Sequence, residues 1–308
     1  MTTTGDIQSA VVIGGTGKTG ARVTQRLTAA GILTRIASRT SGTLFDWNDQ
    51  TTWQPAVSGV DAAYVAYAPD LAVPESSTHI EELANLAYRE GVRRMVLLSG
   101  RGEPAAQKAE RVLADSGLEW AVVRASWFAQ NFSEGYLLDP IREGHLALPT
   151  GGVGEPFIDV DDLADVAVAA LTRTELLGRV LEVTGPELLT FAEAVEAIST
   201  ASGRAVEFER IGLQQFSDSM TEVGIPSDVV ELLTYLFAEV LDGRNQSVTG
   251  VVEEVLERPA RDFTTFAAEV ARTGFGHEEV RGHSGAAGRR DCARRARRRW
   301  CVVCFLPL

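Results

Sequence analysis

The chain has 308 residues, of which 45% are hydrophobic, and its formal net charge is −13. Such a composition is typical of globular chains that form one large domain or two smaller ones. The negative charge argues against a nucleic-acid or anionic-membrane surface on the body and favours a small-molecule partner. The first residues show neither a basic nor an apolar leader pattern, so we expect a cytoplasmic protein.

A glycine-rich segment follows the first apolar run, residues 10–13, and leads into a helix-patterned stretch that ends at Gly31. Gly14, Gly17 and Gly20 have the spacing of a dinucleotide-binding turn. The first glycine permits a tight turn, the second lets the backbone approach a pyrophosphate, and the third lets the helix pack on its strand. The cofactor contacts predicted in this turn are Gly14, Thr16, Gly17, Lys18, Thr19 and Gly20.

Two other interpretations of this segment are weaker. Gly17-Lys18-Thr19 is similar to the end of a P-loop, but that motif needs a glycine where this chain has Val12. A strand, turn and helix whose glycines serve packing alone would not require this spacing. We therefore rank nucleotide binding first.

Apolar strand patterns then alternate with helical ones along the chain. This alternation predicts a doubly wound α/β fold with a parallel sheet and crossover helices. A capping box of Thr78 and Glu81 is expected to begin one of the helices. The predicted strands are 33–38, 61–67, 94–99 and 120–124, and the predicted helices begin near residue 78 and cover 105–116.

The end of the second strand indicates which cofactor is used. An NAD-binding fold usually has an acidic residue here, but this chain has Ser38 followed by Arg39. A guanidinium group suits a 2′-phosphate, and Lys18 would add positive charge to the same pocket. We therefore predict NADP(H) rather than NAD(H), with Ser38 and Arg39 as contacts; the alternative is that Arg39 is a solvated strand-end residue.

Candidate catalytic and substrate residues follow the later strands. Ser99 ends a central strand, where open α/β sheets bind ligands, and it is a candidate hydrogen-bond donor beside the nicotinamide or else a turn residue. Trp127 and Phe128 are candidate walls of an apolar substrate site, with Asn131 to orient the substrate; the alternative for the aromatic residues is the core. Tyr136 is the nearest phenol downstream and the candidate acid.

The alternation loosens after residue 128. The glycine-rich stretch 144–154 is typical of the lip of a cleft or of surface turns. The sequence thus predicts a dinucleotide-binding domain over 1–150 and a smaller, mainly helical lobe over 151–275. Helices of this lobe are expected at 161–171, 191–202, 227–241 and 263–271.

Residues 276–308 differ from the body, because they contain eight arginines and all three cysteines. A zinc site could be assembled from these residues, but one C-x-x-C at a chain end is weak evidence, so we predict no metal. Nucleic-acid binding is the other alternative for a basic run. We expect a disordered or non-native extension. The ligand candidates considered were His277, His283, Cys292, Cys301 and Cys304.

Five motifs together resemble those of the NmrA-like atypical short-chain dehydrogenases. They are the turn 14–20, Ser38-Arg39, Phe45-Asp46-Trp47, Trp127 to Phe132, and Pro156 to Asp162. The resemblance covers roughly residues 8–274 and looks closest to bacterial relatives of the ergot alkaloid festuclavine/agroclavine dehydrogenases, which reduce an iminium with NADPH. It implies a Rossmann fold and an oxidoreductase activity.

One feature of common short-chain dehydrogenases is missing. Their Tyr-x-x-x-Lys pair delivers a proton, but the only lysines here are Lys18 and Lys108, preceded four residues earlier by Gly14 and Pro104. Two functions remain. The chain is either a reductase of an electron-poor acceptor such as an iminium, a quinone or an activated enone, or a non-catalytic NADP(H) sensor that acts on a protein partner, as resemblance to NmrA suggests.

Overall fold

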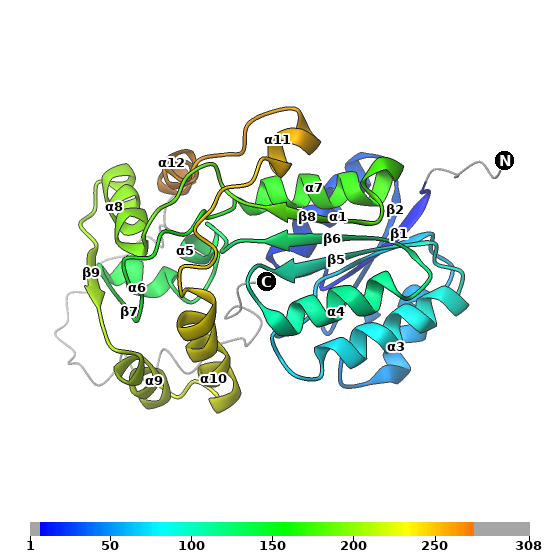
Figure 1. Cartoon of the computed structure of the whole chain (residues 1–308), viewed down its shortest axis with the longest axis horizontal. Coiled ribbons are helices and arrows are strands. Elements are labelled where there is room, and N and C mark those ends of the chain that lie inside the picture. The colour runs from blue at the N-terminus through cyan, green and yellow to red at the C-terminus, as the bar shows by residue number, and fades with distance from the viewer. Residues whose placement is uncertain (1–6, 274–308) are drawn as a thin grey trace, which may run out of the picture.

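Seven parallel strands form the central sheet of the computed structural model, which describes residues 7–273 (Figure 1). Their order is β3-β2-β1-β4-β5-β6-β8. Successive strands are therefore added toward one edge of the sheet from β1 to β3 and toward the other edge from β4 onward, and this order reverses between β1 and β4. Ligands bind at such a switch point, outside the carboxyl ends of the strands. The doubly wound α/β prediction is confirmed. The strands are β1 (Ser9–Ile13), β2 (Leu33–Ser38), β3 (Thr43–Leu44), β4 (Ala62–Val65), β5 (Arg94–Gly100), β6 (Glu119–Ala125) and β8 (Arg179–Val183).

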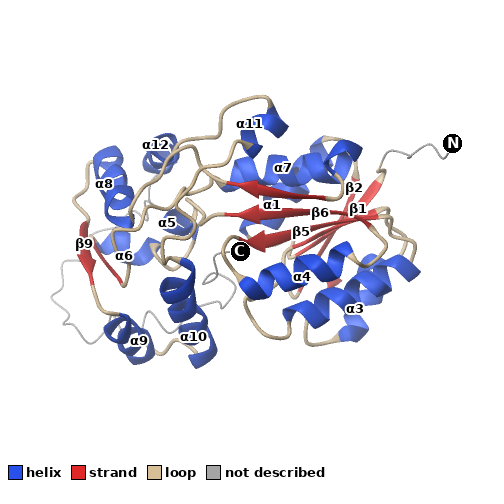
Figure 2. Cartoon of the chain, viewed as in Figure 1, coloured by secondary structure: helices blue, strands red, loops and turns tan. Residues whose placement is uncertain are grey.

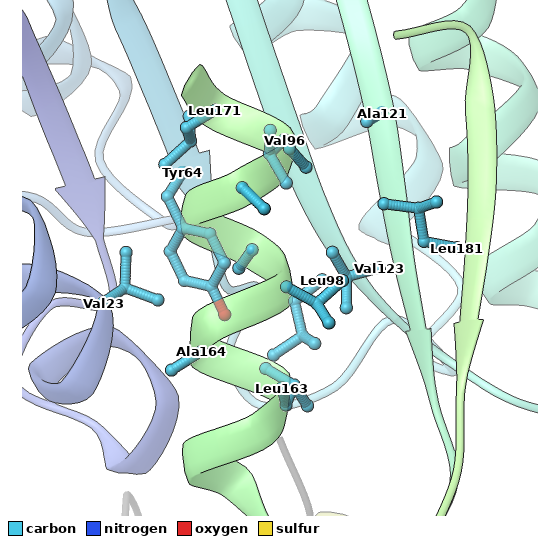
Figure 3. Packing of buried hydrophobic residues seen from close by; sticks show 14 of the residues in the cluster. Val23, Tyr64, Val96, Leu98, Ala121, Val123, Leu163, Ala164, Leu171 and Leu181 are labelled. Atoms are coloured by element: carbon cyan, nitrogen blue, oxygen red, sulfur yellow. The ribbon is translucent and has the colours of Figure 1, made fainter. Parts of the chain in front are cut away.

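Helices cover both faces of this sheet, which is why β4 and β5 are buried along their whole length. One face packs against α1 (Lys18–Ala29) and α7 (Val160–Thr172), and the other against α3 (Ser76–Arg89) and α4 (Pro104–Ala114). Figure 3 shows Leu163 and Ala164 of α7 beside Tyr64 and Leu98 of the sheet. The remaining short helices at this end are η1 (Gln50–Thr52), α2 (Trp53–Val57), η2 (Thr174–Leu176) and α11 (Val251–Leu256).

The start of α3 differs from the prediction. The helix begins at Ser76, and Glu75 before it already has helical dihedral angles, with φ −77° and ψ −15°. Thr78 therefore lies inside the first turn, where the extended conformation of a capping residue is not available, and the predicted capping box does not form. The predicted end is confirmed, because Gly91 follows the helix with φ +85°.

A mainly helical lobe lies beyond the carboxyl ends of the strands, toward which β5, β6 and β8 point (Figure 2). Its core is a single cluster of aromatic and aliphatic side chains, separate from the two clusters on the faces of the sheet. Its elements are α5 (Asn131–Glu134), α6 (Leu138–Glu143), β7 (His145–Leu148), α8 (Phe191–Ser202), β9 (Glu207–Arg210), α9 (Leu213–Glu222), α10 (Ser227–Tyr235), the π-helix Leu236–Val240 and α12 (Phe263–Thr273).

The division of the chain between the two parts is not the predicted one at residue 150. α7 and β8 lie within the range expected for the lobe, yet β8 pairs with β6 in the central sheet. The lobe also takes α5, α6 and β7 from before residue 150. The chain thus enters the lobe three times, because it returns to the sheet first at α7 and β8 and again at α11 before α12.

The tail 276–308, with its candidate zinc ligands and basic run, lies outside the described residues. Within 7–273 there is no group of three or more side chains suited to holding a metal ion. In the same range, every helix is too short or too polar to span a bilayer.

Candidate functional site

The glycine turn after β1 has the geometry that its spacing predicts. Gly14 has φ +77°, and its amide donates to the carbonyl of Ala37 at 2.9 Å. A methyl group on Gly20 would lie 2.3 Å from the carbonyl oxygen of Gly14, so only glycine lets α1 approach the turn this closely. Gly17 precedes the helix, and its amide donates to Gly14 at 2.9 Å. The first and third glycines are therefore required by the backbone itself.

Gly20→Ala is expected to weaken NADPH binding by roughly 10- to 100-fold, because relieving such an overlap costs about 1–3 kcal/mol and displaces α1. Quenching of intrinsic fluorescence during an NADPH titration measures this change. Gly212→Ala is the matched control, since a methyl group there meets nothing within 4 Å. Equal affinities for the two variants would contradict this account of the turn.

The N-terminus of α1 suits a phosphate group. No side chain caps it, and its first turn has no acidic residue, so its amides and positive dipole end are available to an anion. Thr16 is exposed at the top of the turn, whereas Thr19 is buried. The residues therefore fit the pyrophosphate of a dinucleotide, with the predicted glycines and Lys18 at its edge.

Lys18 also joins the turn to the predicted substrate side. Its ammonium group donates to Oδ1 of Asn131 at 2.7 Å, although the two residues are far apart in the sequence. One turn later, Arg22 contacts Glu134 at 2.5 Å and Asp161 at 3.4 Å. The structure therefore brings the predicted cofactor residue Lys18 and the predicted substrate residue Asn131 together.

The loop after β2 leaves one guanidinium in solvent. Ser38 is buried, and its hydroxyl accepts from the amide of Thr40 at 3.2 Å. Ser41 donates to the carbonyls of Ile36 at 3.0 Å and Thr43 at 2.9 Å, which orders the loop. Arg39 is exposed at its tip and makes no ion pair within residues 7–273. Its position at the end of β2 is the one predicted for a 2′-phosphate contact.

Ser99 points away from the glycine turn, toward α4. Its hydroxyl is fully buried and donates to Glu110 at 2.6 Å. Glu110 also accepts from Nε of Arg124 at 2.9 Å, and Arg124 contacts Glu182 at 3.2 Å. Glu182 in turn pairs with Arg101 at 2.8 Å. Ser99 is thus the end of an ionic network inside the sheet domain, and its predicted catalytic role stays a prediction.

The predicted substrate residues are buried. Trp127 packs edge-on against Phe191 at 5.5 Å between ring centroids, inside the lobe core, while Phe128 belongs to the core of the sheet. Asn131 is buried where it receives the bond from Lys18. Tyr136 is partly buried against the lobe core, and burial raises the pKa of its phenol. The roles predicted for these residues stay predictions.

Three buried carboxyl groups were missed by the reasoning from sequence. Asp70 follows β4, Glu103 precedes α4 just after β5, and Glu155 lies beyond β6. Burial raises the pKa of Asp70 to about 6 and that of Glu155 to about 7, and it raises the pKa of Glu103 strongly. For Asp70 and Glu103 the available signal was the position after a strand end, because ligands meet the sheet there. Glu155 instead follows β7 of the lobe, and its Oε1 accepts from the amide of Trp127 at 3.2 Å. A carboxyl group that keeps its proton near neutral pH can donate it.

Comparison with known proteins agrees with this geometry. The family model described as NAD(P)H-binding matches residues 14–174, more than half of the chain. The chain belongs to this family. Within it, the chain is an NmrA-like atypical short-chain dehydrogenase/reductase, as its motifs indicated, and an NAD(P)H-dependent oxidoreductase.

Two named relatives and one solved structure are similar to this chain along most of their length. A (4-alkanoyl-5-oxo-2,5-dihydrofuran-3-yl)methyl phosphate reductase of Streptomyces griseus is 32% identical and matches over 85% of this chain and 97% of its own. Agroclavine dehydrogenase of Claviceps fusiformis is 28% identical and matches over 84% of this chain and 96% of its own. The NADPH-dependent quinone oxidoreductase of Escherichia coli, solved with NADPH, has a TM-score of 0.68 at 18% identity. The match covers 85% of this chain and 99% of that protein.

Proposed function

We propose that this chain uses NADPH to reduce a small electron-poor acceptor, of the class of an iminium ion, a quinone or an activated enone. The observation that carries the proposal is a pyrophosphate turn set in a sequence with no Tyr-x-x-x-Lys pair. The bound cofactor supplies the hydride. The chain supplies the turn at Gly14 to Gly20 and the ammonium group of Lys18, which also holds Asn131 of the predicted substrate segment in place.

The preference for NADPH over NADH rests on Arg39. Its exposed guanidinium stands where NAD-binding folds place an acidic residue for the ribose hydroxyls. A 2′-phosphate would accept bonds from this group, and from Ser38 or Thr40 next to it. A carboxylate is absent at residues 38–41, so NADP(H) meets no repulsion there.

The class of acceptor follows from the missing pair. Reduction of an ordinary ketone leaves an alkoxide that needs a proton, and general acid catalysis contributes about 10²–10⁴ in rate. An electron-poor acceptor depends less on this help. The names of the relatives agree: the Streptomyces enzyme is named for a ring whose carbon–carbon double bond is conjugated with a carbonyl group.

Arg39→Ala is expected to weaken NADPH binding by roughly 10- to 100-fold, the equivalent of a charge-assisted hydrogen bond, and to leave NADH binding within about twofold. Fluorescence titration with NADPH, NADP⁺, NADH and NAD⁺ measures both. Arg89→Ala, an exposed arginine at the end of α3, is the control. A parallel loss for NADPH and NADH would contradict the role of Arg39.

NADPH oxidation with a panel of iminium ions, quinones and enones then tests the reaction. Turnover of any member supports the reductase. Binding without turnover, with different affinities for NADP⁺ and NADPH, would support instead a sensor that acts on a protein partner.

A further inference from the structure

Two carboxyl groups meet in a buried place between adjacent strand ends. Asp70 is fully buried in the loop after β4, and Glu103 is 5% exposed at the start of α4, after β5. The two groups lie within hydrogen-bonding reach of one another. The carboxylate of Glu103 lies over Gly100, where a methyl group would be 1.9 Å from its Oε1. The chain therefore keeps space for this side chain with a glycine.

The hydrogen bonds of the pair are incomplete if both groups are ionised. Oδ1 of Asp70 accepts from the amide of Ala72 at 2.8 Å. Oδ2 of Asp70 and Oε2 of Glu103 are buried, and no donor of residues 7–273 reaches either oxygen. Two buried oxygens without a donor are costly, whereas one proton between two carboxyl groups gives each oxygen a partner.

The surrounding charges do not compensate two carboxylates. Glu110 of the same helix adds negative charge, and none of the interactions that shift the pKa of Asp70 or Glu103 comes from a described cation. Tyr235 of α10 faces the pair from the lobe, with Glu239 and Arg244 beside it; burial and then the charge of Glu103 raise the pKa of its phenol. The pair thus lies between the sheet and the lobe.

We propose that Asp70 and Glu103 share one proton at neutral pH and deliver it to the acceptor during reduction. This inference rests on the proposed function. β4 borders the switch point and β5 is its neighbour, so the loops that carry the pair lie at the edge of the sheet where a dinucleotide binds across the crevice. The pair supplies the proton that a Tyr-x-x-x-Lys tyrosine supplies elsewhere, and the sequence contains no such tyrosine.

The step balances for acceptors that consume a proton. Hydride supplied by a bound reduced nicotinamide would form a C–H bond at the β-carbon of an enone or an O–H bond at one oxygen of a quinone, and the electron pair of the broken π bond would move through the conjugated system to the remaining carbonyl oxygen. That atom takes the proton of the pair, leaving two carboxylates, and solvent returns the proton. An iminium ion needs hydride alone, so the pair favours quinones and activated enones over iminium ions as substrates.

The shared proton can be observed without catalysis. Carbon-13 NMR of the full chain, labelled at the side-chain carboxyls of Asp and Glu, follows each carboxyl group from pH 4 to 9. We expect the pair to retain one proton at pH 7, and both Asp70→Asn and Glu103→Gln to remove its signal. Asp115→Asn, at the exposed far end of α4, is the control. Titration of both groups below pH 5 in the unmutated chain would overturn the proposal.

Delivery of the proton is tested by single-turnover oxidation of NADPH with a small quinone and with an N-alkyl iminium ion. In Glu103→Gln, the ratio of the quinone rate to the iminium rate should fall by about 10²-fold or more. An unchanged ratio would overturn delivery by the pair. An unmutated chain that reduces neither acceptor would contradict the proposed function and this step together, while the carboxyl titration would still decide whether the proton is shared.

Discussion

Phe132→Ala is expected to lower the free energy of unfolding by about 3–5 kcal/mol. Phe132 is fully buried, and its ring packs against Phe157 at 5.4 Å, Phe191 at 5.8 Å and Phe263 at 5.4 Å between centroids. These three rings come from three separate segments, so the cavity would weaken the whole lobe core. Urea denaturation monitored by circular dichroism measures the change.

Phe132→Leu is the control, because it keeps most of the buried volume and should cost less than half as much as alanine. Loss of the Phe132 ring is also expected to affect cofactor binding. Asn131, which receives the hydrogen bond from Lys18, is the residue before Phe132. We expect NADPH affinity to fall in the alanine variant, and a loss of stability under about 1 kcal/mol would contradict this view of the core.

Asp70→Asn is expected to change how stability depends on pH. Burial raises the pKa of Asp70 from 3.8 to about 6 in the folded chain. Because Asp70 binds its proton more tightly in the folded chain than in the unfolded chain, protonation stabilises the fold. This stabilisation is fully present below about pH 4 and is lost as the pH rises through about 6. The loss is on the order of 3 kcal/mol, from 1.36 kcal/mol per pKa unit. Asparagine does not ionise and avoids it.

The stability of the variant relative to the unmutated chain should therefore rise between pH 4 and pH 8. Urea midpoints at a series of pH values measure this difference. Comparing the two chains cancels groups whose pKa is lowered, such as Asp61 and Asp161, which contribute in the opposite direction. A constant difference across this range would show that Asp70 does not titrate in it.

The orientation of Ser99 shows that a strand-end position does not by itself say which way a side chain points. Ser99 is at the end of β5, where a catalytic hydroxyl is expected, but residues 97 and 99 face the helices α3 and α4. Glu103 lies in the short loop between the end of β5 and the start of α4. Proximity to a strand end is thus an incomplete guide, because alternate side chains of a strand point to opposite faces.

The sequence by itself determined the features that depend on neighbouring residues. Gly14 and Gly20 are required by one turn and the helix that follows it, so their spacing predicts the turn. Arg39 directly follows the last residue of β2, and the absence of Tyr-x-x-x-Lys is judged over five consecutive residues. The alternation of strands and helices likewise follows from local hydrophobic periodicity.

Only the tertiary structure decided which distant groups meet. β8 returns to pair with β6, which places the boundary of the lobe where no local signal lies. Trp127 is buried by Phe191, and Asp70 meets Glu103, because the parallel strands before each pair end at the same edge of the sheet. Local propensity cannot encode these contacts, since their energy comes from burial and electrostatics between segments that are separated along the chain.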